Sequence, residues 1–122
     1  MNNIYLMRDQ KMSYNLYKVG FTKDLEKRVY AYTTANPEAC CISFAFTQDR
    51  SKRKVEKLFH DEIAERGYEF VTATIDGKKT EWFKVHRDDP FCKALDEKGL
   101  NAFSTGKNRK AYGELIINKK VR

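Results

Sequence analysis

The sequence lacks any long apolar run. No segment approaches the roughly 18 consecutive apolar residues that a membrane-spanning helix needs, so we expect no membrane association. The first twelve residues, MNNIYLMRDQKM, also lack the apolar core of a secretory signal peptide. Internal repeats and low-complexity segments are absent as well. We therefore expect an intracellular, cytoplasmic protein.

Cysteines are few, and their spacing suits no common site. Cys40 and Cys41 are adjacent and Cys92 lies far from them, which fits neither a disulfide framework nor the spacing of zinc ligands. We interpret all three as reduced thiols. With 122 residues, the chain suits one compact domain that buries a core without disulfides or structural metal.

Positive charge is in excess. The net charge is +7 at neutral pH, and residues 50–57 carry five basic side chains against one acid, while residues 106–122 carry six against one. A basic balance attracts polyanions, of which nucleic acid is the commonest. A solvated basic surface is the alternative interpretation, but the clustering favours contact with phosphate groups.

The apolar pattern predicts an α+β domain. Strands are expected at residues 3–7, 15–21, 39–48 and 68–74, and residues 80–85 are expected to be a short strand or an edge segment. Helices are expected from residue 22 or 24 to about 35, from 49 or 51 to 66, and from 89 to 98. The order implies a small, largely antiparallel sheet of three to four strands flanked by helices.

Two details of this arrangement are expected from composition. Residues 39–48 are apolar enough to form a strand in the middle of the sheet. Residues 1–85 are expected to form the main domain, and residues 86–122 a basic C-terminal extension that packs on the domain or trails from it.

Several polar side chains stand out, although each has a plain interpretation. Tyr5 lies in a strand and on its own reads as a core aromatic. Strand alternation places Tyr17 in the core and Lys18 on the opposite face, where its charge needs water or an anion. Arg28 flanks the apolar stripe of the first helix and on its own reads as a surface arginine.

Glu56 and His60 lie one helical turn apart on one face of the second helix. Such a pair can share a metal ion or a proton. Without a third ligand, however, the usual interpretation is a contact on the surface of a helix.

Taken together, these segments resemble the GIY-YIG nuclease superfamily over about residues 3–85. The resemblance rests on NIY at 3–5, YKVG at 17–20, KDLEKRV at 23–29 and VEKLFH at 55–60. The segments ANPE at 35–38 and EWF at 81–83 are more specifically similar to the compact branch of phages and large DNA viruses. The cytoplasm of a host cell would then be the compartment.

The resemblance implies matches at individual positions. Gly20 matches the glycine that closes the second motif, while Asn3 stands where the first motif usually has glycine. Lys18 stands where the family usually has its second tyrosine, and Tyr17 is displaced by one position. The sequence alone leaves open whether Lys18 or Tyr17 is the functional residue.

The resemblance also implies a mechanism, cleavage of DNA phosphodiester bonds by a metal-dependent endonuclease. Tyr5 would be the general base, with Lys18 lowering its pKa or holding the phosphate. Arg28 would clamp the phosphate oxygens. Glu56 would hold a single Mg²⁺, for which Mn²⁺ can substitute. His60 would orient a water or the base, or simply pack.

DNA is the expected partner of a monomer or weak dimer with no small-molecule cofactor. The expected DNA-contacting residues are Lys23, Lys27, Arg50, Lys52, Arg53, Lys107, Arg109 and Lys110. Two alternatives stay open: a catalytically inactive nucleic-acid-binding module with the same fold, and a protein-interaction domain with an incidental basic surface.

Overall fold

The computed structural model describes residues 2–47 and 52–103, with the side chains of residues 3–45 and 56–103. The elements in chain order are β1 (Asn2–Gln10), β2 (Tyr14–Thr22), α1 (Leu25–Ala35), β3 (Ala39–Thr47), α2 (Lys52–Glu65), β4 (Phe70–Thr72), β5 (Lys79–His86), α3 (Pro90–Lys98) and the short 3₁₀ helix η1 (Gly99–Ala102). None of the helices in this part of the chain is long and apolar enough to cross a membrane.

The strands form one antiparallel sheet in the order β3-β1-β2-β5-β4. The predicted α+β class is confirmed, but the sheet has five strands rather than three to four. The placement of β3 in the middle of the sheet is wrong, because β3 lies at an edge. Its apolar composition has another cause: Ile42 and Phe44 belong to apolar clusters on opposite faces of the sheet, so both faces of this edge strand are covered.

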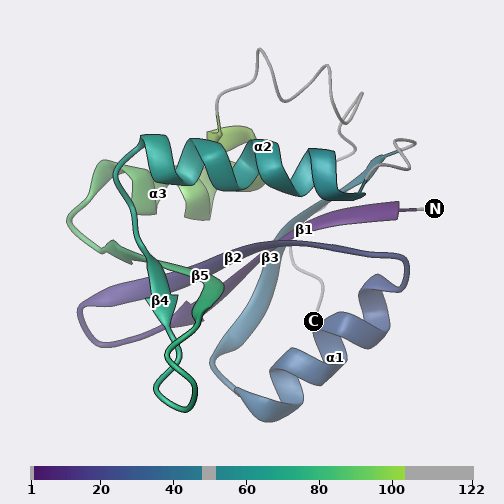
Figure 1. Cartoon of the computed structure of the whole chain (residues 1–122), viewed down its shortest axis with the longest axis horizontal. Coiled ribbons are helices and arrows are strands. Elements are labelled where there is room, and N and C mark those ends of the chain that lie inside the picture. The colour runs from purple at the N-terminus through teal and green to yellow at the C-terminus, as the bar shows by residue number, and fades with distance from the viewer. Residues whose placement is uncertain (1, 48–51, 104–122) are drawn as a thin grey trace.

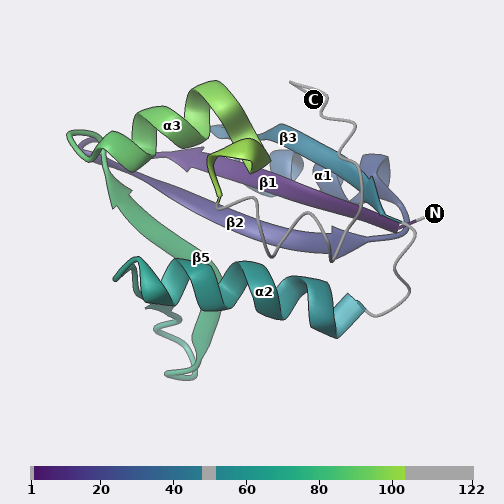
Figure 2. The ribbon, with the colours of Figure 1, turned by 90° about the horizontal axis from the view of Figure 1, so that it is seen from above.

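The helices cover both faces of the sheet (Figures 1 and 2). Helices α2 and α3 lie on one face and α1 lies on the other. The α2/α3 face holds the larger apolar cluster, which includes Leu6, Val19, Phe59 and Phe83. The α1 face holds a smaller cluster of buried residues: Tyr5, Met7, Val29, Ala39, Cys41 and Phe44.

Local hydrogen bonds define where two of the helices begin. The carboxylate of Asp24 accepts from the backbone N–H of Lys27 and caps α1, and Asp89 caps α3 in the same way, with Pro90 in the first turn. Each N-cap stabilises its helix by about 1 kcal/mol. The Asp24 cap places the beginning of α1 at the turn that follows β2.

Helix α3 and η1 pack into the same core as the strands. Leu95, Leu100 and Phe103 are buried in the cluster on the α2/α3 face. No break in packing therefore falls at residue 85, where the main domain was expected to end. Residues 104–122, the greater part of the expected basic extension, lie outside the described residues.

Candidate active site at the edge of β2

The candidate site lies where β2 extends past its neighbour. Strand β5 pairs with residues 14–18 of β2, and residues 19–22 continue beyond this pairing. In Figure 1, this end of β2 passes between α2 on one side and α1 on the other. Side chains from both faces of the sheet therefore meet around one strand edge.

Tyr5 lies beneath this edge in closely fitted packing. It pairs with Gly20 across the β1–β2 ladder, and a Cβ atom at position 20 would lie 2.2 Å from the Tyr5 hydroxyl oxygen. The Tyr5 side chain is 0% exposed, and its hydroxyl makes no hydrogen bond among the described residues. Glycine is therefore required at position 20 to leave room for the Tyr5 ring.

Lys18 contacts one residue of α1 and one residue of β5. Its ammonium donates a hydrogen bond to the Tyr32 hydroxyl and lies 3.3 Å from a carboxylate oxygen of Glu81. The Lys18 side chain is only 12% exposed, so these two partners replace most of its water. The predicted alternation is confirmed, because the neighbouring Tyr17 is fully buried in the cluster on the opposite face.

Tyr32, on α1, packs between aromatic rings from two strands of the sheet. Its ring lies 6.5 Å from that of Tyr5 and 5.9 Å from that of Trp82, measured between centroids. Burial alone would raise the pKa of the Tyr32 hydroxyl, but the hydrogen bond and the charge of Lys18, together with Tyr5 and Arg28, lower it below its usual value. Of Tyr5 and Tyr32, therefore, only Tyr32 has its pKa lowered at this site.

Arg28 lies one turn before Tyr32 on α1. Partial burial disfavours its charge, but the nearby hydroxyls of Tyr5 and Tyr32 outweigh this effect and raise the pKa of the guanidinium. Arg28 is exposed, and its guanidinium interacts with Tyr32 and Tyr5 at the same rim. A guanidinium in this position is suited to bind an anion.

The expectation that Lys18 lowers the pKa of Tyr5 is wrong. Burial and the neighbouring Tyr32 hydroxyl raise the pKa of Tyr5 well above its usual range, and only Arg28 opposes them appreciably. Lys18 acts on Tyr32 instead. The interpretation of Tyr5 as a core aromatic holds for its ring, although its unpaired hydroxyl is unusual for a core position.

Tyr17 is far from this chemistry. Its hydroxyl donates to Asp96 over 2.7 Å and accepts from Asn15 over 3.0 Å, on the α2/α3 face of the sheet. Burial raises its pKa. The structure therefore brings Lys18, and not Tyr17, to the candidate site.

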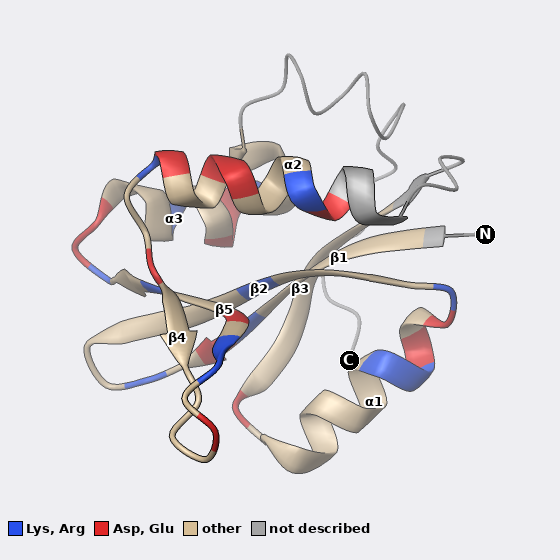
Figure 3. Cartoon of the chain, in the orientation of Figure 1, with Lys and Arg blue, Asp and Glu red and all other residues tan. Residues whose placement is uncertain are grey.

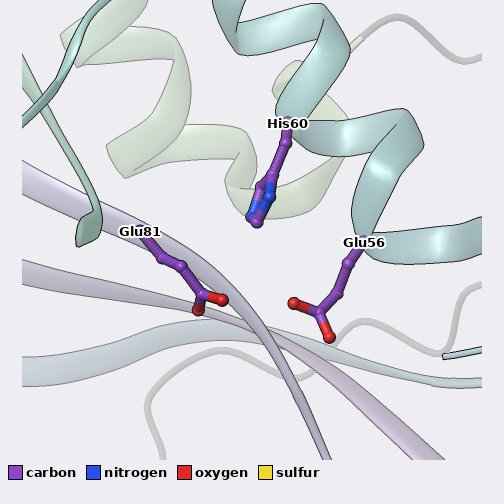
Figure 4. Close-up of side chains that lie close together, drawn as sticks. All are labelled: Glu56, His60 and Glu81. Atoms are coloured by element: carbon purple, nitrogen blue, oxygen red, sulfur yellow. The ribbon is translucent and has the colours of Figure 1, made fainter. Parts of the chain in front are cut away.

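Helix α2 and strand β5 supply a second polar group at the same edge (Figure 4). Glu56, His60 and Glu81 each offer one ligand atom, and these atoms all lie within 4.8 Å of one another. His60 Nε2 lies 3.3 Å from the backbone oxygen of Val19, which ties its ring to the edge of β2. The predicted Glu56–His60 pair thus gains a third potential ligand. The donor set suits a hard or borderline divalent cation.

The neighbouring acid of α2 is directed away from this group, as its helical phase predicts. Asp61 is exposed and forms an ion pair of 2.9 Å with Lys57. Such an exposed i,i+4 pair contributes only about 0.3–0.5 kcal/mol. Asp61 therefore offers a natural control for the acids of the site.

The sequence prediction missed two residues of this site. Tyr32 fits the apolar stripe of α1, and its spacing of four residues from Arg28 places both on one side of the helix. Glu81 was noted only within the EWF segment. Its acidic side chain directly before the aromatic pair Trp82–Phe83 of β5 is the sequence signal for this position.

Basic and acidic residues alternate at the beginning of α1, beside the site (Figure 3). Lys23 and Lys27 are exposed there with Arg28, and Asp24 and Glu26 lie between them. The side chains of the other expected DNA-contacting residues lie outside those described: Arg50, Lys52, Arg53, Lys107, Arg109 and Lys110.

The fold and the site define a small α+β domain with a polar, cation-rich site built at a sheet edge. Comparison with protein-family models matches residues 2–96 to the T5orf172 domain. The chain therefore belongs to the T5orf172 family, a phage-associated domain of a nuclease-related clade. There was no direct match to the GIY-YIG family itself. Neither the curated proteins nor the solved structures contain a match.

Proposed function

We propose that this protein is a metal-dependent endonuclease of the GIY-YIG type that hydrolyses DNA phosphodiester bonds. Membership of the T5orf172 family is compatible with a nuclease. The observation that carries the proposal is the hydrogen bond from Lys18 to Tyr32, which favours a phenolate at the same strand edge as the Glu56, His60 and Glu81 ligand atoms.

In the proposed reaction, the Tyr32 phenolate takes a proton from a water molecule. The resulting hydroxide forms a bond to phosphorus while the bond from phosphorus to the leaving oxygen breaks, and solvent supplies the proton that this oxygen takes up. Lys18 favours the Tyr32 phenolate by its charge and its hydrogen bond. Tyr5 fixes the position of the Tyr32 ring from below and also favours its phenolate.

Arg28 binds the non-bridging oxygens of the phosphate in this proposal. Its fork of donors stabilises the negative charge that grows as the hydroxide attacks. Glu56 would be the principal residue that holds a divalent cation, and such an ion would supply Lewis-acid stabilisation of the phosphate. Lys23 and Lys27 attract the DNA backbone towards the site.

Cleavage of supercoiled plasmid DNA tests the proposal. We expect nicking with Mg²⁺ or Mn²⁺ and none with a chelator. Tyr32→Phe and Glu56→Ala should each abolish it while the circular dichroism spectrum stays that of the wild type. Cleavage that is unchanged in Glu56→Ala would refute the metal-ligand role.

A nucleic-acid-binding module without cleavage is the second candidate, and the burial of Tyr5 favours it. The residue that matches the first-motif tyrosine is 0% exposed, so its hydroxyl has no direct access to a substrate. Salt-sensitive DNA binding without nicking under any divalent cation would support this candidate. Failure to retain DNA even at low salt would instead support the protein-interaction alternative.

A further inference from the structure

We propose that Glu56, His60 and Glu81 together form one divalent-cation site, and that this site binds Mn²⁺ more tightly than Mg²⁺. The inference extends the metal requirement of the proposed function, which assigned Glu56 alone. It adds two ligands to Glu56: the imidazole of His60 from α2 and the carboxylate of Glu81 from β5.

Distances support a shared ion. Ligand atoms bound to one divalent metal lie about 2.0–2.2 Å from it, so neighbouring ligands are separated by roughly 3–4.4 Å. The three ligand atoms already lie within 4.8 Å of one another. In Figure 4, the two carboxylates and the imidazole point towards the same space from α2 and β5. Small side-chain rotations would complete the geometry.

The surroundings of His60 suit a metal ligand. Because a backbone carbonyl can only accept, the contact with Val19 O means that His60 Nε2 carries the proton, which leaves the lone pair on Nδ1. A metal-binding histidine commonly donates its second ring N–H to a carbonyl in this way. The edge-on contact with the Phe70 ring, 5.3 Å between centroids, further restricts the orientation of the imidazole.

Glu81 is shared between two partners. Its carboxylate forms the ion pair with Lys18 and also faces Glu56 and His60. Two carboxylates this close repel each other unless positive charge lies near them. The Glu81 side chain is 46% exposed, so hydrated ions can reach it. A cation bound here would be held directly beside the Lys18–Tyr32 pair.

The mixed donor set determines the preferred metal. Mg²⁺ favours oxygen ligands and keeps several waters, whereas an imidazole nitrogen adds affinity for transition metals such as Mn²⁺. A site of two carboxylates and one imidazole should therefore rank Mn²⁺ above Mg²⁺. A site made by Glu56 alone would give little such preference.

Titration of the full chain with Mn²⁺, followed by electron paramagnetic resonance of the free ion, tests the inference without any cleavage assay. We expect one Mn²⁺ per chain, with displacement requiring at least about tenfold more Mg²⁺. Glu56→Gln, His60→Gln and Glu81→Gln should each weaken binding at least about tenfold, since loss of an outer-shell partner alone costs about 10- to 100-fold. Electron spin echo modulation should detect a bound ¹⁴N that disappears in His60→Gln.

Two control variants separate ligand loss from other effects. Asp61→Asn removes an exposed acid from the same helix and should bind Mn²⁺ as the wild type does. Lys18→Met breaks the ion pair with Glu81 from the other side, so it should bind Mn²⁺ at least as tightly. Weaker binding in Lys18→Met would mean that the Glu81→Gln effect comes from the broken ion pair, which would overturn the role of Glu81 as a ligand.

The outcomes distinguish this inference from the proposed function. Wild-type affinity in Glu81→Gln and His60→Gln, or the absence of a ¹⁴N signal, would overturn the three-ligand site even if DNA is cleaved. Mn²⁺ binding that depends on all three residues, in a chain that never nicks DNA, would support the site and refute the nuclease.

Discussion

Each face of the sheet buries a tyrosine, and the two hydroxyls differ in their hydrogen bonds. On the α2/α3 face, Tyr17 is enclosed by partners that use its hydroxyl fully, among them Asp96 and Asn15. On the α1 face, the equally buried Tyr5 hydroxyl makes no hydrogen bond among the described residues. The Tyr5 hydroxyl instead interacts with the neighbouring Tyr32 hydroxyl and the Arg28 guanidinium.

The difference separates structure from function in this fold. Tyr5 lies where Lys18, Arg28 and Tyr32 gather, and no comparable group of cations and hydroxyls surrounds Tyr17 in the described part of the chain. Tyr32 shows a second contrast, because Lys18 and Arg28 lower the pKa of its hydroxyl. The polar groups of the α1 face therefore gather at the edge of β2, whereas those around Tyr17 are used within the core.

Among the variants that test this difference between the two faces, Tyr32→Phe is expected to have the largest effect. Removing the proposed base should lower the cleavage rate by about 10²- to 10⁴-fold. The midpoint of thermal unfolding should change little, because the half-buried ring keeps its contacts with Tyr5 and Trp82. Single-turnover plasmid nicking and thermal denaturation measure the two effects. A nicking rate within twofold of the wild type would remove Tyr32 from the mechanism.

A smaller effect is expected from Gly20→Ala, which tests how tightly the α1 face is packed around Tyr5. The added methyl carbon would lie 2.2 Å from the Tyr5 hydroxyl oxygen, so the ring has to move. Overpacking of this kind costs about 1–3 kcal/mol, measurable by urea denaturation. The cost should largely vanish when Gly20→Ala is made in a Tyr5→Ala background. An equal cost in both backgrounds would show that the ring is not the obstacle.

Local rules predicted most of the secondary structure. The caps at Asp24 and Asp89 depend on hydrogen bonds within three residues, so the sequence locates the beginnings of α1 and α3. The position of β3 was not predictable in this way. An edge strand covered on both faces has the composition of a central strand, and only the packing of distant helices distinguishes them.

For the candidate site too, the sequence predicted what depends on local spacing and not what depends on contacts between distant segments. Strand alternation placed Lys18, and helical spacing placed Glu56 beside His60. Tyr32 and Glu81 join them only because β5 stops pairing with β2 at Lys18 and α1 packs below, which are contacts between distant segments. The burial of the Tyr5 hydroxyl is equally non-local, so its pKa could not be read from its position in a strand.

Tyr17→Phe provides the matched test on the α2/α3 face. Losing the hydroxyl removes the hydrogen bonds to Asp96 and Asn15 and should lower the free energy of unfolding by about 1 kcal/mol. Cleavage of DNA should stay at the wild-type rate, because Tyr17 lies on the opposite face of the sheet. Denaturant titration and plasmid nicking check both statements. A loss of cleavage larger than the loss of stability would contradict the separation of the two faces.

Lys18→Met should give the smallest effect, a displacement of the pH profile along the pH axis. The Lys18 charge and hydrogen bond hold the pKa of Tyr32 below its usual value, so the Tyr32 phenolate and the cleavage rate should both rise with pH. Without Lys18 the same rise should occur at higher pH, and at the top of the profile the rate should approach that of the wild type. Single-turnover rates measured across alkaline pH for both proteins provide the test. The direction is diagnostic: if Lys18 instead only binds phosphate, the variant should be slower by a constant factor at every pH, with an unmoved midpoint.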